Sequence, residues 1–164
     1  MFARLFYSLF AAAGGAGFSQ FPEYFAHYLQ RLGGRIDQAR VRVEEIKEDA
    51  AAKSMSVPDY IESFIASDPH SLEGARMRES FFELADMEAA YQALSAAGTL
   101  QRPIAFIEHF DGGLVGATLG DFAPAMPLSV EGLIYAGVGA IAGLFLCSGS
   151  RRVLRRKRTR KAEA

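Results

Sequence analysis

Cysteine, histidine and recognisable catalytic motifs are scarce in this chain of 164 residues, which has one cysteine, Cys147, and three scattered histidines. A single cysteine excludes a disulfide within the chain, and no CxxC or Cys/His spacing predicts a zinc site. No serine stands in a G-x-S-x-G context, and no glycine-rich loop has phosphate-binding spacing. The sequence therefore predicts no catalytic residue, bound metal or cofactor, and we expect a protein that is not an enzyme.

Alternation of apolar and polar residues, which is typical of strands, is also absent, and apolar residues instead recur at helical spacing. One stripe repeats every three or four residues through three heptads: Leu29, Leu32, Ile36, Ala39, Val43, Ile46 and Ala50. A second stripe has the same spacing: Met77, Phe81, Leu84, Met87, Tyr91 and Leu94. Two long helices with such stripes predict an antiparallel, coiled-coil-like hairpin. The Gly33-Gly34 pair predicts a bend or a close helix contact in the first helix.

Several shorter elements are expected around this hairpin. Residues 54–58 break the first helix, and 59–66 have the pattern of a short helix. The pair Asp68-Pro69 predicts the start of the second long helix, and Gly98 predicts its end. Residues 104–110 add a short helix, whereas the apolar, glycine-rich segment 114–126 has no clear assignment and is compatible with a position on a membrane surface.

Two apolar stretches have the length of membrane spans. Residues 5–21 are uncharged and lie at the lower limit for crossing a bilayer, which takes about 20 residues. A secretory signal peptide is the alternative, but no clean A-x-A cleavage site follows, which favours an uncleaved anchor. The second stretch begins after Pro127, which suits the first turn of a helix, and ends near Gly149. Glu131 falls in that first turn, where an interfacial position is favoured over a proton or ion path.

Charge is segregated along the chain. Residues 22–126 carry nine basic and seventeen acidic side chains, whereas residues 151–164 carry eight basic side chains and one acidic side chain. Positive charge next to a span resists translocation, so both termini are expected in the cytoplasm and the central segment outside. The basic anchor begins with Arg151, Arg152, Arg155 and Arg156. Directly after a span, such a tail favours anionic lipid over nucleic acid as its partner.

The resulting organisation is all-α, with two transmembrane helices flanking an extramembrane antiparallel helical hairpin. The predicted boundaries are 1–21 for the first span, 22–126 for the hairpin domain, 127–150 for the second span and 151–164 for the tail. Small residues at i and i+4 in the spans, Ala13 with Gly17 and Gly139 with Gly143, predict faces for close helix packing. Three partners for these faces stay open: the other span of the same chain, a second copy of the chain, or a larger membrane complex.

Two blocks of sequence resemble a known family. The first is SQFPEYF followed by YLQRLGG, in residues 19–34, and the second is FAPAMPLSVEGL, in residues 122–133. Both are similar to the domain of unknown function 2937 family of small bacterial membrane proteins. The resemblance implies a two-span protein of the bacterial inner membrane, of unassigned function and with no catalytic residues to transfer. With the orientation that the charges predict, its central domain is then expected in the periplasm. It directs attention to a candidate site at the membrane interface: Phe21, Pro22, Glu23, Arg31, Gly33, Gly34, Pro124, Pro127 and Glu131.

We therefore expect a non-enzymatic integral membrane protein, an accessory or scaffold subunit that associates with a membrane partner or with itself. The alternative is a protein that handles lipid or a small molecule. Its pocket would lie at the outer membrane surface, formed by the amphipathic segment 114–126 and the aromatic side chains Phe21, Tyr24, Phe25 and Phe122.

Overall fold

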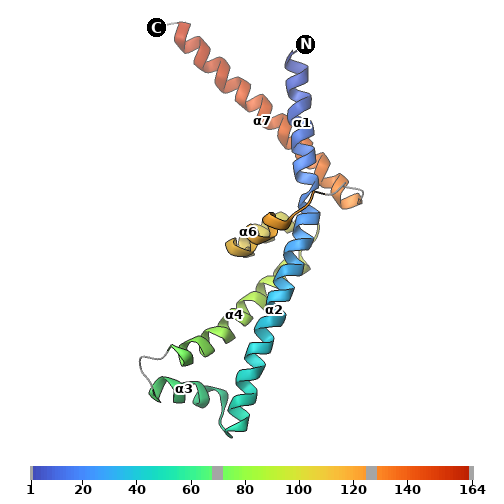
Figure 1. Ribbon diagram of the computed structural model, residues 1–164. Coiled ribbons are helices and arrows are strands. Elements are labelled where there is room, and N and C mark those ends of the chain that lie inside the picture. The colour runs from blue at the N-terminus through green and yellow to red at the C-terminus, as the bar shows by residue number, and fades with distance from the viewer. Residues whose placement is uncertain (1, 68–71, 125–128, 163–164) are drawn as a thin grey trace. The chain divides into compact units, whose positions relative to one another are not determined.

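The computed structural model describes the backbone of residues 2–67, 72–124 and 129–162, and side chains within residues 5–148 of these ranges (Figure 1). This part of the chain is helical and contains no strand, so the predicted all-α class is confirmed. Contacts divide the chain into two units, the first made of residues 1–26 and 121–164 and the second of residues 27–120. Each unit is described by itself.

The first unit is a pair of packed helices. Helix α1 spans Phe2–Ser19, and α7 spans Val130–Ala162. Pro22, the second residue of the next helix, explains why α1 ends near Gln20, since proline has no N–H to continue the ladder but fits a first turn. Helix α7 continues beyond Gly149, where the predicted span ends, through the basic tail.

The second unit is built on the long helix α2, which spans Phe21–Ala52 and crosses the boundary between the units. The predicted stripe is buried along α2 at Leu32, Ile36, Ala39, Val43 and Ala50, whereas Leu29 and Ile46 are partly exposed. The helix is continuous through Gly33-Gly34, so no interruption occurs there. A Cβ on Gly33 would meet the Tyr91 ring at 3.7 Å, which is an ordinary side-chain contact rather than a close approach of two helices.

Helix α2 ends in a left-handed cap. Ser54 has a φ of 53°, while the N–H of Met55 donates to the Ala50 carbonyl and that of Ser54 to the Ala51 carbonyl, both at 2.9 Å. This is the Schellman arrangement, in which glycine is the usual residue at the left-handed position. The predicted break at residues 54–58 is therefore made by the backbone of a serine.

Helices α3 (Val57–Ser67) and α4 (Glu73–Ala96) follow, and α4 runs back toward α2 at an angle (Figure 1). Close backbone approach in the described part of this unit occurs between α3 and α4 and between α4 and α5, so the coiled-coil-like packing of α4 on α2 stays a prediction. An ion pair of 2.8 Å joins Arg40 of α2 to Glu88 of α4. Gly74 lies at the crossing of α3 and α4, where a Cβ would come within 2.9 Å of the Ile61 carbonyl oxygen. The predicted capping pair Asp68-Pro69 lies outside the described residues. On α4, Leu94 is fully buried but Tyr91 is exposed, so the second stripe is a less complete core than predicted.

Two short helices follow, α5 (Arg102–His109) and α6 (Gly112–Asp121). Helix α5 lies close to the predicted residues 104–110. Most of the segment 114–126, which has no clear assignment from the sequence, belongs to α6 up to Asp121. Its first turn is capped by Asp111, whose carboxylate accepts the N–H of Leu114 at 2.6 Å.

Candidate functional site

The helices α1 and α7 touch through backbone rather than through large side chains. A Cβ built on Gly139 would collide with the carbonyl oxygen of Gly14, and one built on Gly143 would collide with that of Phe10. Only glycine permits this approach, which brings Cα–H groups against carbonyl oxygens of the other helix. Gly139 and Gly143 therefore face α1, which is one of the three kinds of partner that their spacing of four left open.

The small residues predicted on α1 do not lie at this contact. Ala13 is exposed, and a Cβ on Gly17 would have nothing within 4 Å. Gly14 and Gly15 take the expected place, since a Cβ on Gly15 would lie 3.1 Å from the Ala136 carbonyl oxygen. The face of α1 that contacts α7 is therefore the one that carries Gly14 and Gly15, not the predicted face with Ala13 and Gly17.

The outer surfaces of α1 and α7 carry the large apolar side chains. Those that are mostly exposed are Leu5, Phe6, Leu9, Val130, Leu133, Ile141, Phe145 and Leu146, whereas Gly132, Gly139, Gly143 and Cys147 are buried. Fully exposing a Leu, Ile or Phe side chain to water costs about 1.5–3 kcal/mol compared with burying it. This pair of helices therefore has the distribution of side chains that suits an apolar solvent.

One helix in the described part of the chain is long and apolar enough to cross a membrane, over Val130–Ser148. Helix α1 is of similar length, with 18 residues, but Arg4, Tyr7 and its glycines lower its mean hydropathy. Length and composition alone thus single out the second predicted span.

Aromatic side chains cluster where α2 begins. The Phe21 ring lies 5.7 Å from Phe25 and 5.4 Å from Tyr135 of α7, and the Tyr24 ring meets Phe122 edge-on at 5.7 Å. Four of these five were predicted to line a pocket, and the structure packs their rings on one another. Tyr135 was missed, although its spacing of four from Gly139 on one helix face was a usable signal.

The remaining candidate interface residues are divided between the two units. In the first unit, Glu23 and Pro124 are exposed, and Glu131 is half-buried in the first turn of α7. Ser129 caps that turn, its Oγ accepting the N–H of Gly132 at 3.0 Å. Pro127 lies outside the described residues.

Arg31 and Gly34 belong to the second unit, where they line an open cavity of about 300 Å³ together with Arg35 and Gln38 of α2. The other wall is formed by α6 through Gly113, Leu114 and Ala117. This cavity brings two cations one helical turn apart against a helix that is uncharged from Gly112 to Gly120. No sequence pattern indicated that α6 would lie there.

A buried tyrosine holds α5 and α6 against α2. Tyr28 is fully buried, its ring packs edge-on against Phe106 at 4.9 Å, and its hydroxyl accepts the backbone N–H of Asp111 at 2.9 Å. Burial raises the pKa of the Tyr28 hydroxyl above its ordinary value, although the donated N–H opposes this shift. Arg35 also reaches the Asp111 carboxylate, at 3.6 Å.

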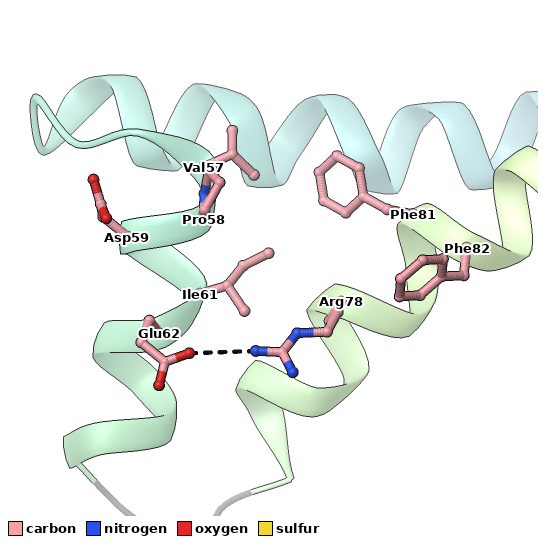
Figure 2. Close-up of a pocket in the computed structure, with 8 residues that line it drawn as sticks. All are labelled: Val57, Pro58, Asp59, Ile61, Glu62, Arg78, Phe81 and Phe82. Atoms are coloured by element: carbon pink, nitrogen blue, oxygen red, sulfur yellow. Dashed lines mark hydrogen bonds and ion pairs between the residues drawn. The ribbon is translucent and has the colours of Figure 1, made fainter.

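A larger groove of about 610 Å³ lies between α3 and α4, as Figure 2 shows. Its walls are mainly apolar, from Val57, Pro58, Ile61, Phe81 and Phe82, and an ion pair of 3.3 Å joins Glu62 to Arg78 across it. None of the aromatic residues predicted to form a pocket lines this groove.

One further set of predicted site residues remains, the basic anchor. Arg151, Arg152, Arg155 and Arg156 belong to the C-terminal part of α7, and their side chains lie outside the described part of the structure. Within the described residues, no group of three or more His, Cys, Asp or Glu side chains converges as metal ligands would.

Comparison with known proteins identifies the family. Neither the curated proteins nor the solved structures contain a match to this chain. The model of a family described as protein of unknown function (DUF2937) matches residues 2–160, which is nearly the whole sequence. The chain therefore belongs to the DUF2937 family.

Proposed function

We propose that this chain is a non-enzymatic integral membrane protein in which α1 and α7 cross the bilayer together and hold the helical unit of residues 27–120 outside it. The observation that carries the proposal is the inverted packing of α1 and α7. Their contact face is made of glycine and other small residues, while Leu, Ile and Phe side chains cover the outside. Helices associate in this way in lipid, where no hydrophobic effect drives them together.

The lengths of the two helices suit this arrangement. At about 1.5 Å per residue, the 18 residues of α1 and the 19-residue apolar window of α7 extend for about 27 Å and about 29 Å. The hydrocarbon core of a bilayer is about 30 Å thick. Pairing with α7 compensates for the lower hydropathy of α1, because part of its polar backbone surface is covered by the partner.

Charge supports one orientation. The eight basic residues within 151–164 favour a cytoplasmic C-terminus, and two spans then bring the N-terminus to the same side. In a bacterial inner membrane, the acidic segment 22–126 would face the periplasm.

The role we favour is that of an accessory or scaffold subunit, acting in a homo-oligomer or a larger membrane protein complex. Two long exposed helices offer a recognition surface of the coiled-coil kind. The lipid- or ligand-handling alternative keeps one supporting observation, the apolar groove between α3 and α4. Purification in mild detergent separates the two, since a stoichiometric protein partner supports the first and a bound lipid or small molecule without such a partner supports the second.

Membrane insertion and orientation have a direct test. After alkaline carbonate washing, the full chain should stay in the membrane fraction. A reporter active only in the periplasm should be silent when fused after Ala164 and active when inserted at Ser56, beside the exposed end of α2. Extraction by carbonate would refute the spans, and the reverse reporter pattern would refute the orientation.

A further inference from the structure

Helices α5 and α6 present large apolar side chains to the outside of the second unit. On α5, Ile104 and Ile107 are 61% and 70% exposed, and they continue the three- and four-residue spacing that begins at the exposed Leu100. Phe110 and Leu119 are at least half exposed in the segments that follow. Exposed apolar side chains that recur on one helix face, as Leu100, Ile104 and Ile107 do, mark contact with another apolar phase.

The same helices are firmly held on their inner side. Phe106 packs on the Tyr28 ring, and Leu114 and Thr118 of α6 are buried. The exposure of Ile104 and Ile107 is therefore not the result of loose packing. These helices have one face fixed to α2 and a second apolar face directed outward.

Charge and chain continuity indicate what covers that second face. Helix α6 has no charged residue from Gly112 to Gly120, and only residues 120–129 separate Leu119 from α7, the helix proposed to cross the bilayer. A short chain segment thus leads from the exposed apolar face to the membrane.

The cations beside α6 add a second argument. Arg31 and Arg35 line the cavity of about 300 Å³ whose other wall is α6. Residues 27–42 carry four arginines and one aspartate, whereas residues 43–96 carry four basic and twelve acidic side chains. The part of α2 that holds α5 and α6 is thus the basic part of an otherwise acidic domain. Arginine beside an apolar face is the combination by which interfacial helices bind anionic lipid.

We propose that α5 and α6 form a lipid-contact surface on the outer leaflet, with Ile104, Ile107 and Leu119 among the acyl chains and Arg31 and Arg35 near the lipid phosphates. This proposal depends on the proposed function, since it needs α7 in the bilayer.

The absence of tryptophan from the chain provides the test. Single-tryptophan variants Ile107→Trp, Leu72→Trp and Phe145→Trp are reconstituted into vesicles of phosphatidylethanolamine and phosphatidylglycerol brominated at shallow or deep acyl positions. Leu72 is the matched control, because it is an apolar side chain of the same unit that is 63% exposed. Phe145 reports on α7 and is 72% exposed.

The expected result is several-fold stronger quenching of tryptophan at position 107 than at position 72, most of it from the shallow bromines. Quenching at 145 without quenching at 107 would overturn the lipid-contact surface and leave the proposed spans intact. A lack of quenching at 145 would overturn the proposed function and this inference together.

The phosphate contact is tested in the Ile107→Trp background with Arg31→Gln and, as a control that also removes one arginine from α2, Arg42→Gln. Shallow quenching should fall for Arg31→Gln only, and only in vesicles that contain phosphatidylglycerol. Equal effects of the two changes would refute a specific contact between Arg31 and lipid phosphate.

Discussion

The close backbone contact between Gly143 of α7 and Phe10 of α1 gives the sharpest prediction. A Cβ at position 143 would lie 2.9 Å from the Phe10 carbonyl carbon and 3.4 Å from the Ala11 nitrogen, whereas ordinary contacts of a Cβ begin near 3.4 Å. Even alanine therefore requires the helices to move apart. Isoleucine adds three more carbon atoms, and β-branching restricts the rotamers that would avoid the collision.

The matched control is Gly137, on the same helix, where an added Cβ would have nothing within 4 Å. We expect Gly143→Ile to destabilise the α1–α7 pair by about 1–3 kcal/mol, the range for forcing extra atoms into a packed interface. Gly137→Ile adds apolar surface that faces outward and should leave the pair unchanged or slightly more stable.

Unfolding of the full chain in mixed detergent micelles, followed by circular dichroism, measures both changes, and size-exclusion chromatography shows whether either alters assembly. Lower stability at unchanged oligomeric state is expected for Gly143→Ile, because the partner helix belongs to the same chain. Dissociation of an oligomer would place another subunit at that face instead. Equal stability of the two variants would refute close packing at Gly143.

Three further predictions concern the second unit and are measured by urea unfolding of the full chain in detergent. Gly74→Ala should lower the free energy of unfolding by about 1–3 kcal/mol, because the added Cβ meets the Ile61 carbonyl. Gly34→Ala is the control, since its Cβ enters open space, and it should raise the free energy of unfolding by about 0.5–1 kcal/mol. Equal effects of the two changes would contradict the close crossing of α3 and α4. Ser54→Gly should raise the free energy of unfolding by about 1 kcal/mol, because glycine adopts the left-handed backbone of this position without the strain that a Cβ causes. A lower free energy of unfolding would show that the serine side chain itself stabilises the cap. Burial raises the pKa of the Tyr28 hydroxyl in the folded chain, so the unfolded chain loses this proton at a lower pH. The burial of the neutral hydroxyl therefore contributes its full stability below about pH 10, the ordinary pKa of tyrosine. This stability is lost as the pH rises from there toward the folded pKa. Tyr28→Phe should remove this loss of stability above about pH 10 and lower the free energy of unfolding by about 1 kcal/mol at neutral pH. An unchanged dependence of stability on pH would refute the burial of the hydroxyl.

The heptad stripe of α2 was predictable because large apolar residues recur there among charges, so only one face can be buried. The structure shifts its beginning from Leu29 to Tyr28. That choice depends on Phe106 and the N–H of Asp111, which meet Tyr28 only after the chain has folded back. A periodic pattern within one helix carries no information about such a partner.

The contact face of α7 was also predictable, whereas that of α1 was not. On α7, Gly139 and Gly143 are separated by larger residues, so a spacing of four identifies one face. On α1, residues 11–17 are all alanine or glycine, and almost any pair in the run has the required size. Choosing Ala13 and Gly17 there was wrong because composition does not fix rotation about the helix axis.

Helix α6 escaped prediction for an energetic reason. Each glycine costs about 1 kcal/mol relative to alanine inside a helix, and this segment of ten residues contains four. Its stability comes from the Asp111 cap and from burial of Leu114 and Thr118, which are tertiary effects. Propensity alone therefore argues against a helix that the fold supports.

Helix α2 and the α1–α7 pair follow opposite packing rules, and this contrast is the strongest physical argument about the molecule. In the second unit, α2 buries Leu32, Ile36 and Val43 and exposes charges, as a helix in water does. In the first unit, the helices bury glycine and expose Leu, Ile and Phe. Water alone does not favour both distributions, whereas the proposed passage of the chain from water into lipid accounts for both. The contacts divide the chain at residues 26/27 and 120/121, whereas hydropathy and charge predict boundaries at 21/22 and 126/127.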